Sequence, residues 1–385
     1  MNPQCCNDSI FQTSNGSIFN SSTHDDHISR DGDSEHAIVK MMQEPPLIES
    51  NFAMAVIYII LMVAALSIGT VGNILILISS CVFRGLRKHG FVFVINLAAA
   101  DLCVAGIADP MCVIAVLKGE AWFNDKQWLC ETVAAMCLTA CFCAFLSLTL
   151  ASVNRYVFVC HNMLYAKLFT KKMCVIMCIS AWLMAFTFEF PNFVGWGDHA
   201  FDKKSHQCIW DRTASLSYTV IVSVCLIGGP LVTMAMCYIL IFIKIYSTKA
   251  NLYKMDHDDP DYMKKVWSET LKSSRMLCII FIIFVLLWSP YAVVIAADVK
   301  DAMPVSLHLF VTMLAHLHSS VNFCVYIGCN KNFRVCVLRL LRCDKLTHTG
   351  LLSETRSTSG QKMHSVSGTV SSKCPVTAEK EPKIA

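Results

Sequence analysis

The residues that could do chemistry in this chain are ionisable side chains that stand inside apolar stretches. Asn154, Arg155 and Tyr156 follow a run from 132 to 152 that contains no charged residue. A guanidinium at membrane depth costs at least about 2.5–3.5 kcal/mol, so we expect Arg155 to have a function. Asp101 stands in another apolar stretch, where an ionisable group is functional by default. No nucleophile–base or metal-ligand spacing accompanies these groups, so they indicate a conformational switch and not catalysis.

The composition indicates that the bilayer is the solvent of this chain. Of the 385 residues, 55% are hydrophobic and only 16% are charged, which excludes an ordinary soluble domain. Seven hydrophobic stretches are long enough to cross about 30 Å of hydrocarbon, and they cover 52–82, 91–117, 132–158, 173–196, 214–243, 276–297 and 303–328. The sequence therefore predicts an all-α membrane protein, a seven-transmembrane helix bundle over 51–328.

The distribution of charge predicts the orientation of this bundle. The first 50 residues hold eight acidic and two basic side chains, and they carry three glycosylation sequons, at Asn7, Asn15 and Asn20. Basic residues gather in the first, third and fifth connections and after the last helix. We therefore expect a disordered, glycosylated tail over 1–50 outside the cell, on a multi-pass protein of the plasma membrane. The net charge of +4 reflects this topology and does not indicate nucleic-acid binding.

Two further segments are expected on the inner side of the membrane. Apolar and basic residues alternate at helical spacing over 329–343, which predicts an amphipathic helix on the inner leaflet, with Cys343 as a candidate for palmitoylation. Residues 344–385 are polar and rich in serine, which is typical of a disordered, phosphorylatable tail. Most of the 21 cysteines lie in apolar stretches, where cysteine is a small buried hydrophobe, so no metal or cofactor is expected.

Polar and aromatic residues recur at characteristic places in the seven stretches. They are Asn73, Asp101, Asn154, Arg155, Tyr156, Trp182, Pro230, Tyr238, Phe284, Trp288, Pro290, Asn322 and Tyr326, followed by Asn332, Phe333 and Arg334. This set resembles the rhodopsin-like (class A) G-protein-coupled receptors over about 52–343. Residues 154–156, with 160–161, 165–168, 191–192, 218–219 and 330–334, look more closely like melatonin receptors and their invertebrate relatives.

The resemblance implies a switch at the inner end of the bundle. Arg155 would contact a heterotrimeric G protein when the inner ends of the helices separate. The residues implied in coupling and switching are Asn154, Arg155, Tyr156, Tyr238, Phe145, Pro230, Phe284, Trp288, Pro290, Asn322 and Tyr326. Many relatives hold the arginine with two acids, but Asn154 and Thr270 stand in those places here. We therefore expect a weak or differently built inactive-state lock.

A polar core is implied around Asp101. We expect Asn73 and Asn322 to donate hydrogen bonds to this carboxylate, as a structural hub that is compatible with a function of Asp101. In the wider class the aspartate binds sodium together with a hydroxyl residue of helix three and an asparagine of helix seven. Ala144 and His318 occupy those places, which argues against sodium binding here. His318 is expected to pair with Asp101 when it is charged.

The implied ligand-binding residues are Cys137, Cys141, Asn192, Arg212, Tyr291 and His316. Cys137 stands where amine receptors place an aspartate, and His316 stands where opsins carry the retinal-binding lysine. Asn192 matches an asparagine of the melatonin receptors, whereas Arg212 replaces their glutamine. A small neutral ligand, melatonin-like or another indole or lipid, is therefore expected.

The outer end of the bundle carries the last implied features. Cys130 and Cys208 would form a disulfide between helix three and the second outer loop. Asp109 and Glu189 are the carboxylates nearest to the ligand, and both are expected near the outer rim.

Other functions fit the sequence less well. A seven-helix transporter predicts inverted repeats and a chain of ionisable residues, but Asp101 and Asp109 share one helix and no repeat is visible. A membrane enzyme would need a nucleophile–base or metal-ligand spacing, and this sequence shows neither. A peptide or orphan receptor of the same class stays open. The resemblance favours the inhibitory G-protein class, with arrestin and receptor kinases acting on the phosphorylated tail.

Overall fold

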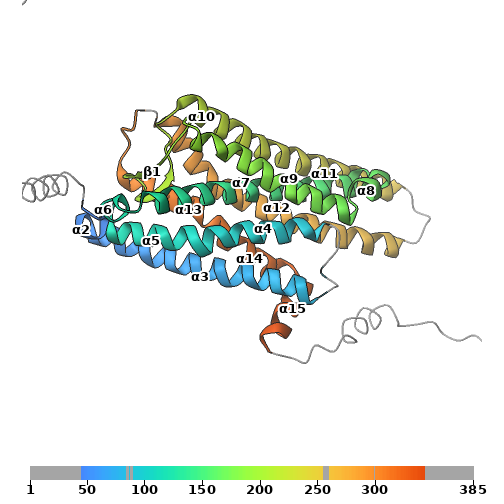
Figure 1. Ribbon diagram of the computed structural model, residues 1–385. Helices are drawn as coiled ribbons and strands as arrows, with labels where there is room; N and C mark the ends of the chain where they lie inside the picture. Colours follow the sequence, from blue (N-terminus) through green and yellow to red (C-terminus); the bar gives the residue numbers. More distant parts are fainter. Residues whose placement is uncertain (1–44, 84–85, 87–89, 255–259, 299, 343–385) are drawn as a thin grey trace, which may run out of the picture.

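Long apolar helices packed side by side make up most of the described chain (Figure 1). The computed structural model describes residues 45–83, 86, 90–254, 260–298 and 300–342. The elements of the first half are α2 (Leu47–Ser50), α3 (Phe52–Val82), α4 (Phe91–Cys103), η2 (Val104–Ala108), α5 (Asp109–Lys118), α6 (Ala121–Asn124), α7 (Gln127–Cys160), α8 (Asn162–Leu168), α9 (Lys171–Glu189) and η3 (Phe190–Phe193). The second half holds β1 (His199–Asp202), β2 (Gln207–Trp210), α10 (Leu216–Ile221), η4 (Val222–Gly228), α11 (Gly229–Lys254), α12 (Pro260–Ala297), α13 (Val305–His316), α14 (His318–Cys329) and α15 (Lys331–Leu341).

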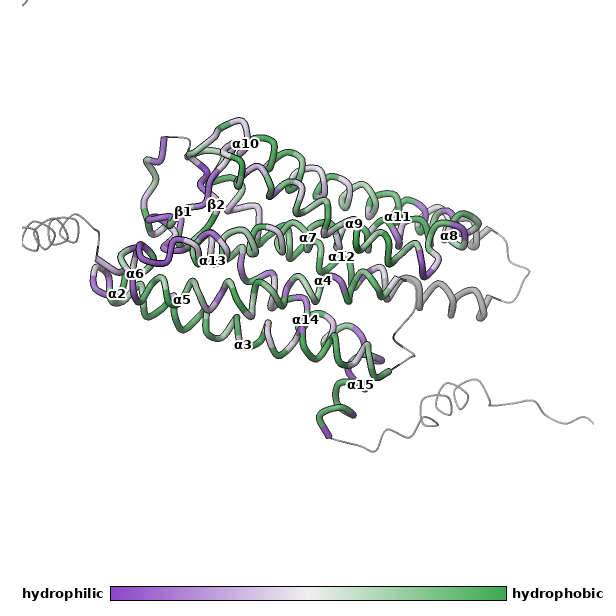
Figure 2. Tube along the Cα trace, in the orientation of Figure 1, coloured by the Kyte–Doolittle hydropathy of each residue, from purple (hydrophilic) through white to green (hydrophobic). Residues whose placement is uncertain are grey.

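The seven predicted spans are all present in this fold. Six continuous helical stretches among the described residues are long and apolar enough to cross a membrane, and the pair α13–α14 makes a seventh. Apolar colour runs along the helices, and polar colour gathers at their ends (Figure 2). The chain is therefore a seven-helix bundle, as predicted.

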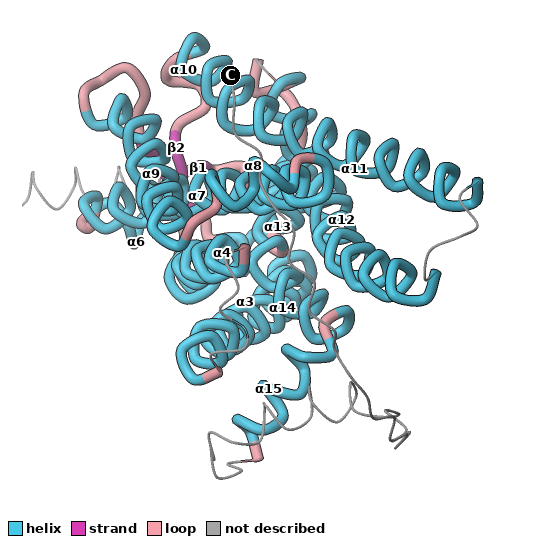
Figure 3. The backbone as a smooth tube through the Cα atoms, turned by 90° about the vertical axis from the view of Figure 1, so that its right-hand side faces the viewer, coloured by secondary structure: helices cyan, strands magenta, loops and turns pink. Residues whose placement is uncertain are grey.

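Helix α7 lies near the centre of the bundle (Figure 3). In its most apolar window 72% of the residues are buried, against 28% for α3 and for α9. The sequence from 127 to 160 contains neither glycine nor proline, so no residue interrupts its hydrogen-bond ladder. A continuous central helix can therefore place Cys130 at one end of the molecule and Arg155 near the other.

Two prolines explain interruptions of neighbouring helices. Pro110 and Pro230 each stand two residues after a π-helical segment, η2 and η4 respectively. A proline ring clashes with the carbonyl group four residues earlier, and a wider turn relieves that clash. The last span differs from the single stretch expected over 303–328, because it is bent by 40° between His316 and His318.

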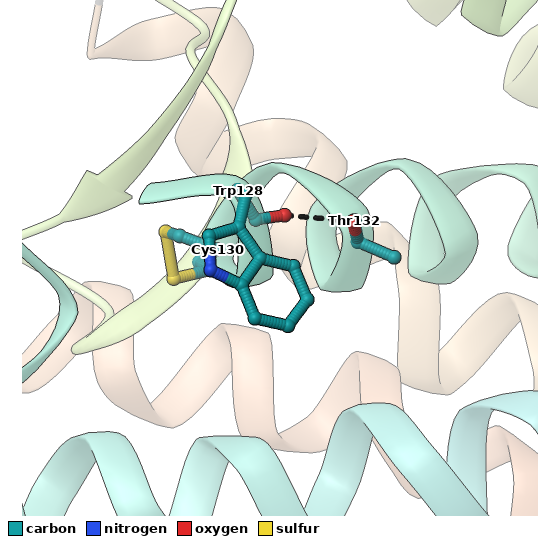
Figure 4. The surroundings of a disulfide bond; sticks show 4 residues. Trp128, Cys130 and Thr132 are labelled. Atoms are coloured by element: carbon teal, nitrogen blue, oxygen red, sulfur yellow. Dashed lines mark hydrogen bonds between the residues drawn. A yellow bond between two sulfur atoms is a disulfide. The ribbon is translucent and has the colours of Figure 1, made fainter. Parts of the chain in front are cut away.

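The second outer loop forms an antiparallel hairpin that the sequence analysis did not predict. Strands β1 and β2 pair in a register that sets His199 opposite Trp210 and Phe201 opposite Cys208. The predicted disulfide between Cys130 and Cys208 is present, and it holds β2 against the first turn of α7. Figure 4 shows the bond beside Trp128, whose carbonyl accepts a hydrogen bond from the Thr132 hydroxyl (2.7 Å).

Near the two ends of the chain, the structure describes α15 and a short part of the N-terminal tail. Helix α15 is amphipathic and buries Phe333, Cys336 and Val337, within the range predicted for it. The tail predicted over 1–50 is not wholly irregular, since α2 buries Leu47 against the outer ends of α3 and α5. The rest of that tail, its three asparagine sequons, Cys343 and the C-terminal tail lie outside the described residues.

Candidate functional site

Arg155 lies partly buried on the last turns of α7. Its guanidinium carbon lies 5.9 Å from the ring centroid of Phe158. No described carboxylate lies within ion-pair distance of it, and the side chain of Thr270 is outside the described set. Asn154 turns towards Tyr165, with 3.5 Å from its amide nitrogen to the hydroxyl. Among the described residues, Arg155 is therefore held by packing. A weak or differently built inactive-state lock on this arginine stays a prediction.

The tyrosines implied in coupling line the same end of the bundle. The Tyr156 hydroxyl lies 3.0 Å from Nε2 of His161, at the inner end of α7. Tyr238 of α11 lies 3.2 Å from the Ser152 hydroxyl. The hydroxyl of Tyr326 is buried and has no described hydrogen-bond partner. It is therefore available for a new contact if the inner ends of the helices move.

The predicted aromatic element is assembled at mid-membrane. The ring of Phe145 lies 4.6 Å from that of Phe284 and 4.8 Å from that of Trp288. His318 joins this cluster, with its ring 5.4 Å from both Phe284 and Trp288. Pro290 lies inside α12 two residues after Trp288, and Pro230 is buried in α11. Sequence analysis predicted that His318 lies beside Asp101, but it did not predict the contact of His318 with Trp288.

The polar core differs from the predicted hub in one bond. Asn322 donates a hydrogen bond to Oδ2 of Asp101 (2.6 Å), as expected. Asn73 instead donates to the carbonyls of Gly69 (2.9 Å) and Ser319 (2.8 Å). Ser319 lies just after the bend of the last span, so Asn73 joins α3 to α14 close to that bend. The expected bond from Asn73 to Asp101 is therefore wrong.

His318 faces the other oxygen of Asp101. Its Nε2 lies 3.7 Å from Oδ1, while its Nδ1 lies 2.6 Å from the carbonyl of Ala315. A carbonyl can only accept, so Nδ1 carries the proton of a neutral ring and Nε2 then faces Asp101 with a lone pair. Both facing atoms are buried without a hydrogen bond. The arrangement is favourable only when one of the two groups carries an additional proton.

Buried histidines pair with carboxylates at four places in the described chain: His199 with Glu189, His308 with Asp298, His316 with Asp109, and His318 with Asp101. Sequence analysis anticipated only the last pair, because the family resemblance set only His318 and Asp101 beside each other. His316 Nδ1 lies 2.7 Å from Oδ1 of Asp109, and His199 Nε2 lies 2.5 Å from Oε1 of Glu189. Asp109 and Glu189 are fully buried, so neither carboxylate is open to solvent.

Most of the implied ligand residues lie in the outer half of the bundle. Cys137 and Cys141 are buried one turn apart on α7. Asn192 is buried in η3, directly after α9, and donates to the Tyr218 hydroxyl (2.8 Å). Tyr291 is buried in α12, with its ring 5.8 Å from that of Trp288. These side chains come from four spans and could surround one small ligand.

Arg212 belongs instead to an ion network over the outer ends of the last two spans. It forms an ion pair with Asp301 and donates to the carbonyl of Asp298. Lys204, in the turn of the hairpin, binds the same two aspartates, at 3.3 Å from Asp298 and 3.0 Å from Asp301. Arg212 therefore fastens the hairpin to the loop between α12 and α13, and its charge is already compensated without a ligand.

The same network brings three ligand-type side chains together. The donor atoms of Asp298, Asp301 and His308 lie within 4.8 Å of one another, although no metal site was expected from the sequence. Lys204 binds both carboxylates and Arg212 binds that of Asp301, so a metal ion would have to displace two cations. These three side chains therefore fit an ion network that joins two loops better than they fit a metal site.

Comparisons with known proteins agree with this architecture. Residues 72–326 match the family described as 7 transmembrane receptor (rhodopsin family). The chain is similar to melatonin receptor type 1B of Homo sapiens, with 26% identity over 279 residues that cover 71% of this chain and 75% of the relative. Melatonin receptor type 1A of Mus musculus is 25% identical over 296 residues, covering 75% of this chain and 80% of that protein. Squid rhodopsin has a similar fold, with a TM-score of 0.65 at 18% identity, covering 80% of this chain and 93% of that one.

Proposed function

Because the chain belongs to the rhodopsin family of seven-transmembrane receptors, we propose that it binds a small neutral extracellular ligand and activates a heterotrimeric G protein of the inhibitory class. The chain is a multi-pass membrane receptor related to melatonin receptors, and it is not an enzyme. The plasma membrane is its proposed location, with the N-terminus outside. Arrestin and receptor kinases are proposed partners of its C-terminal tail.

The balance of charge around Cys137 supports a neutral ligand. Asp109 and Glu189, the carboxylates expected nearest to the ligand, are already paired with His316 and His199. An ammonium group would therefore enter without a free counter-ion, at an effective penalty of several kcal/mol. Since about 1.4 kcal/mol is tenfold in affinity, biogenic amines should bind at least about a hundredfold worse than neutral ligands of equal size.

A cAMP assay in cells that express the full chain tests this proposal. N-acetylated indoles, neutral lipids and peptides are screened for lowering of forskolin-stimulated cAMP, with Arg155→Ala as the matched control. Competition between serotonin and its N-acetylated form then tests the charge argument. A lowering of cAMP by a neutral indole that Arg155→Ala removes is the expected result. Nanomolar binding of the free amine would show that the pocket holds a free counter-ion. A response to peptides alone would favour a peptide receptor of the same family.

A further inference from the structure

Two buried polar atoms near the outer half of α5 have no hydrogen-bond partner. Asp109 of α5 is fully buried, and Gln207 of β2 is 2% exposed. Oδ2 of Asp109 and Nε2 of Gln207 form no hydrogen bond with the described residues. A buried acceptor and a buried donor without partners are unfavourable, so a ligand group that satisfies both of them gains affinity here.

The side chains of Asp109 and Gln207 meet around Cys112. Asp109 and Cys112 are three residues apart on α5, so they share one face of that helix. The thiol of Cys112 donates to Oε1 of Gln207 (3.0 Å). The amide group of Gln207 therefore lies against the same face of α5 as Asp109, about 4.5 Å further along the helix axis. We call Asp109, Cys112, Gln207 and His316 the α5 polar cluster.

The existing contacts of the α5 polar cluster leave one acceptor and one donor free. Nδ1 of His316 lies 2.7 Å from Oδ1 of Asp109, and Cys112 occupies the amide oxygen of Gln207. A single hydroxyl oxygen can donate its proton and also accept a hydrogen bond. Since each such bond is about 2.7–3.0 Å long, one oxygen can bridge two atoms up to about 6 Å apart. A neutral hydroxyl group therefore matches both free atoms, whereas an ether oxygen, which only accepts, matches one.

The polar residues that the resemblance implied for the ligand are engaged elsewhere. Asn192 donates to the Tyr218 hydroxyl (2.8 Å). A Cβ atom at Gly197 would lie 2.0 Å from Oδ1 of Asn192, so the loop backbone covers that oxygen. Arg212 is paired with Asp301. The hydrogen-bonding anchor for a ligand is therefore more favourable at the α5 polar cluster.

His316 links the α5 polar cluster to the implied ligand site. The resemblance placed this residue at the ligand, and the structure pairs it with Asp109. Although His316 belongs to a membrane span, 8% of its side chain stays accessible, whereas that of Asp109 is fully buried. A ligand that contacts His316 therefore lies next to the carboxylate of Asp109.

We propose that the α5 polar cluster binds the hydroxyl group of a neutral phenol or alcohol, whose O–H donates to Oδ2 of Asp109 and whose oxygen accepts from Nε2 of Gln207. This subsite rests on the proposed function, because it belongs to the neutral ligand of that receptor. His316 balances the charge of Asp109, so the ligand needs no ammonium group. Gln207 directly precedes Cys208, which is bound to Cys130, so the ligand would join α5 to the hairpin and α7.

A pair of fluorinated fragments tests the subsite without an agonist or a G protein. Para-fluorophenol carries the hydroxyl group, and para-fluoroanisole replaces it with a methyl ether that has no proton to donate. Binding to the full chain in nanodiscs is measured by fluorine NMR, with empty nanodiscs as the reference for partition into lipid. We expect the phenol to bind at least about tenfold more tightly than the ether, because the ether loses the bond to a charged carboxylate. Equal binding of the two fragments, or binding of neither, would overturn the proposal.

Gln207→Met tests the second hydrogen bond. Methionine keeps the length of glutamine but has no donor, so phenol binding should fall at least about fivefold. Lys203→Met, at an exposed position in the turn of the hairpin, is the matched control and should leave phenol binding unchanged. Unchanged phenol binding in Gln207→Met would contradict the subsite. The Tm of each variant without fragment shows whether it is folded, and the comparison of phenol with ether in the unchanged chain needs no variant.

Failure of the proposed function is distinguishable from failure of the subsite. A chain that binds the phenol through Gln207 but answers no neutral ligand in the cAMP assay would contradict the proposed function alone. A chain that answers a neutral ligand but does not distinguish the phenol from the ether would contradict the hydroxyl subsite alone.

Discussion

The guanidinium of Arg155 lies over the ring of Phe158. It lies at the inner end of α7, whereas Cys137 and Cys141 lie five and four turns earlier on the same helix, at about 5.4 Å per turn. We therefore expect Arg155→Ala to abolish agonist-stimulated nucleotide exchange and to leave ligand affinity within a few fold. Nucleotide exchange and radioligand binding on the same membranes measure the two effects.

A control separates this effect from a general loss of positive charge. Lys118→Ala removes an exposed cation from the other end of the bundle and should leave nucleotide exchange unchanged. If Arg155→Ala destroyed ligand binding while the receptor still reached the cell surface, its assignment to the inner switch would be wrong.

His318 is the second residue whose replacement should change a response. Its Nε2 faces Oδ1 of Asp101 at 3.7 Å, and an imidazole nitrogen is a poor ligand for sodium, a hard cation that prefers oxygen. Asparagine is shorter and offers an amide oxygen, which suits a hard cation. We expect His318→Asn to make agonist affinity sensitive to sodium, measured in sodium chloride against choline chloride at equal ionic strength. The sodium sensitivity should disappear when Asp101→Asn is added to His318→Asn. An unchanged salt response in His318→Asn alone would contradict the idea that His318 prevents sodium binding at Asp101.

At the scale of elements, the hairpin and the loop between α12 and α13 are joined by the outer ion network. Asp298 lies in this loop, just outside the membrane span. Burial alone would raise its pKa, but hydrogen bonds from His308, the amides of Met303 and Ala302, and Lys204 hold the pKa of Asp298 well below its ordinary value of 3.8. A carboxyl group with a lowered pKa stabilises the fold above its ordinary pKa, and this stabilisation is lost as the pH falls through the folded-state value.

We therefore expect Asp298→Asn to lower Tm of the purified receptor at neutral pH. The difference from the unchanged chain should narrow as the pH is lowered below about 4, because Asp298 becomes protonated there in the unfolded chain, and it should vanish as the pH falls through the lower folded-state pKa. Thermal unfolding across this pH range is the measurement, and Asp125→Asn, at an exposed position after α6, is the control. An unchanged Tm at neutral pH would mean that the network does not stabilise the outer loops.

At the scale of the whole molecule, the orientation of the bundle predicts modification of the N-terminal tail. Asn7, Asn15 and Asn20 can carry N-glycans only if this tail faces the lumen during synthesis. We expect a glycosidase that removes N-glycans to increase the gel mobility of the unchanged chain. Replacing all three asparagines by glutamine should abolish that shift. A glycosidase-insensitive chain at the cell surface would contradict either the use of these sequons or the proposed orientation.

The sequence alone determined the number, position and class of the spans. Crossing a bilayer requires about 20 consecutive apolar residues, and this requirement is local, so composition along the chain shows it directly. Motif residues such as Arg155, Trp288 and Asn322 were identifiable for a related reason, since their types and spacing stand out against an apolar background.

The tertiary structure decided which polar groups meet. His316 and Asp109 are separated by 207 residues, and Lys204 and Asp298 by 94, so no local pattern could pair them. The bend between α13 and α14 let Asn73 bind the carbonyl of Ser319 instead of Asp101. The unpartnered atoms of Asp109 and Gln207 depend on how α5 packs against α13 and the hairpin. A buried polar atom takes whichever partner the packing of distant segments brings within hydrogen-bond distance, and only the folded chain determines that choice.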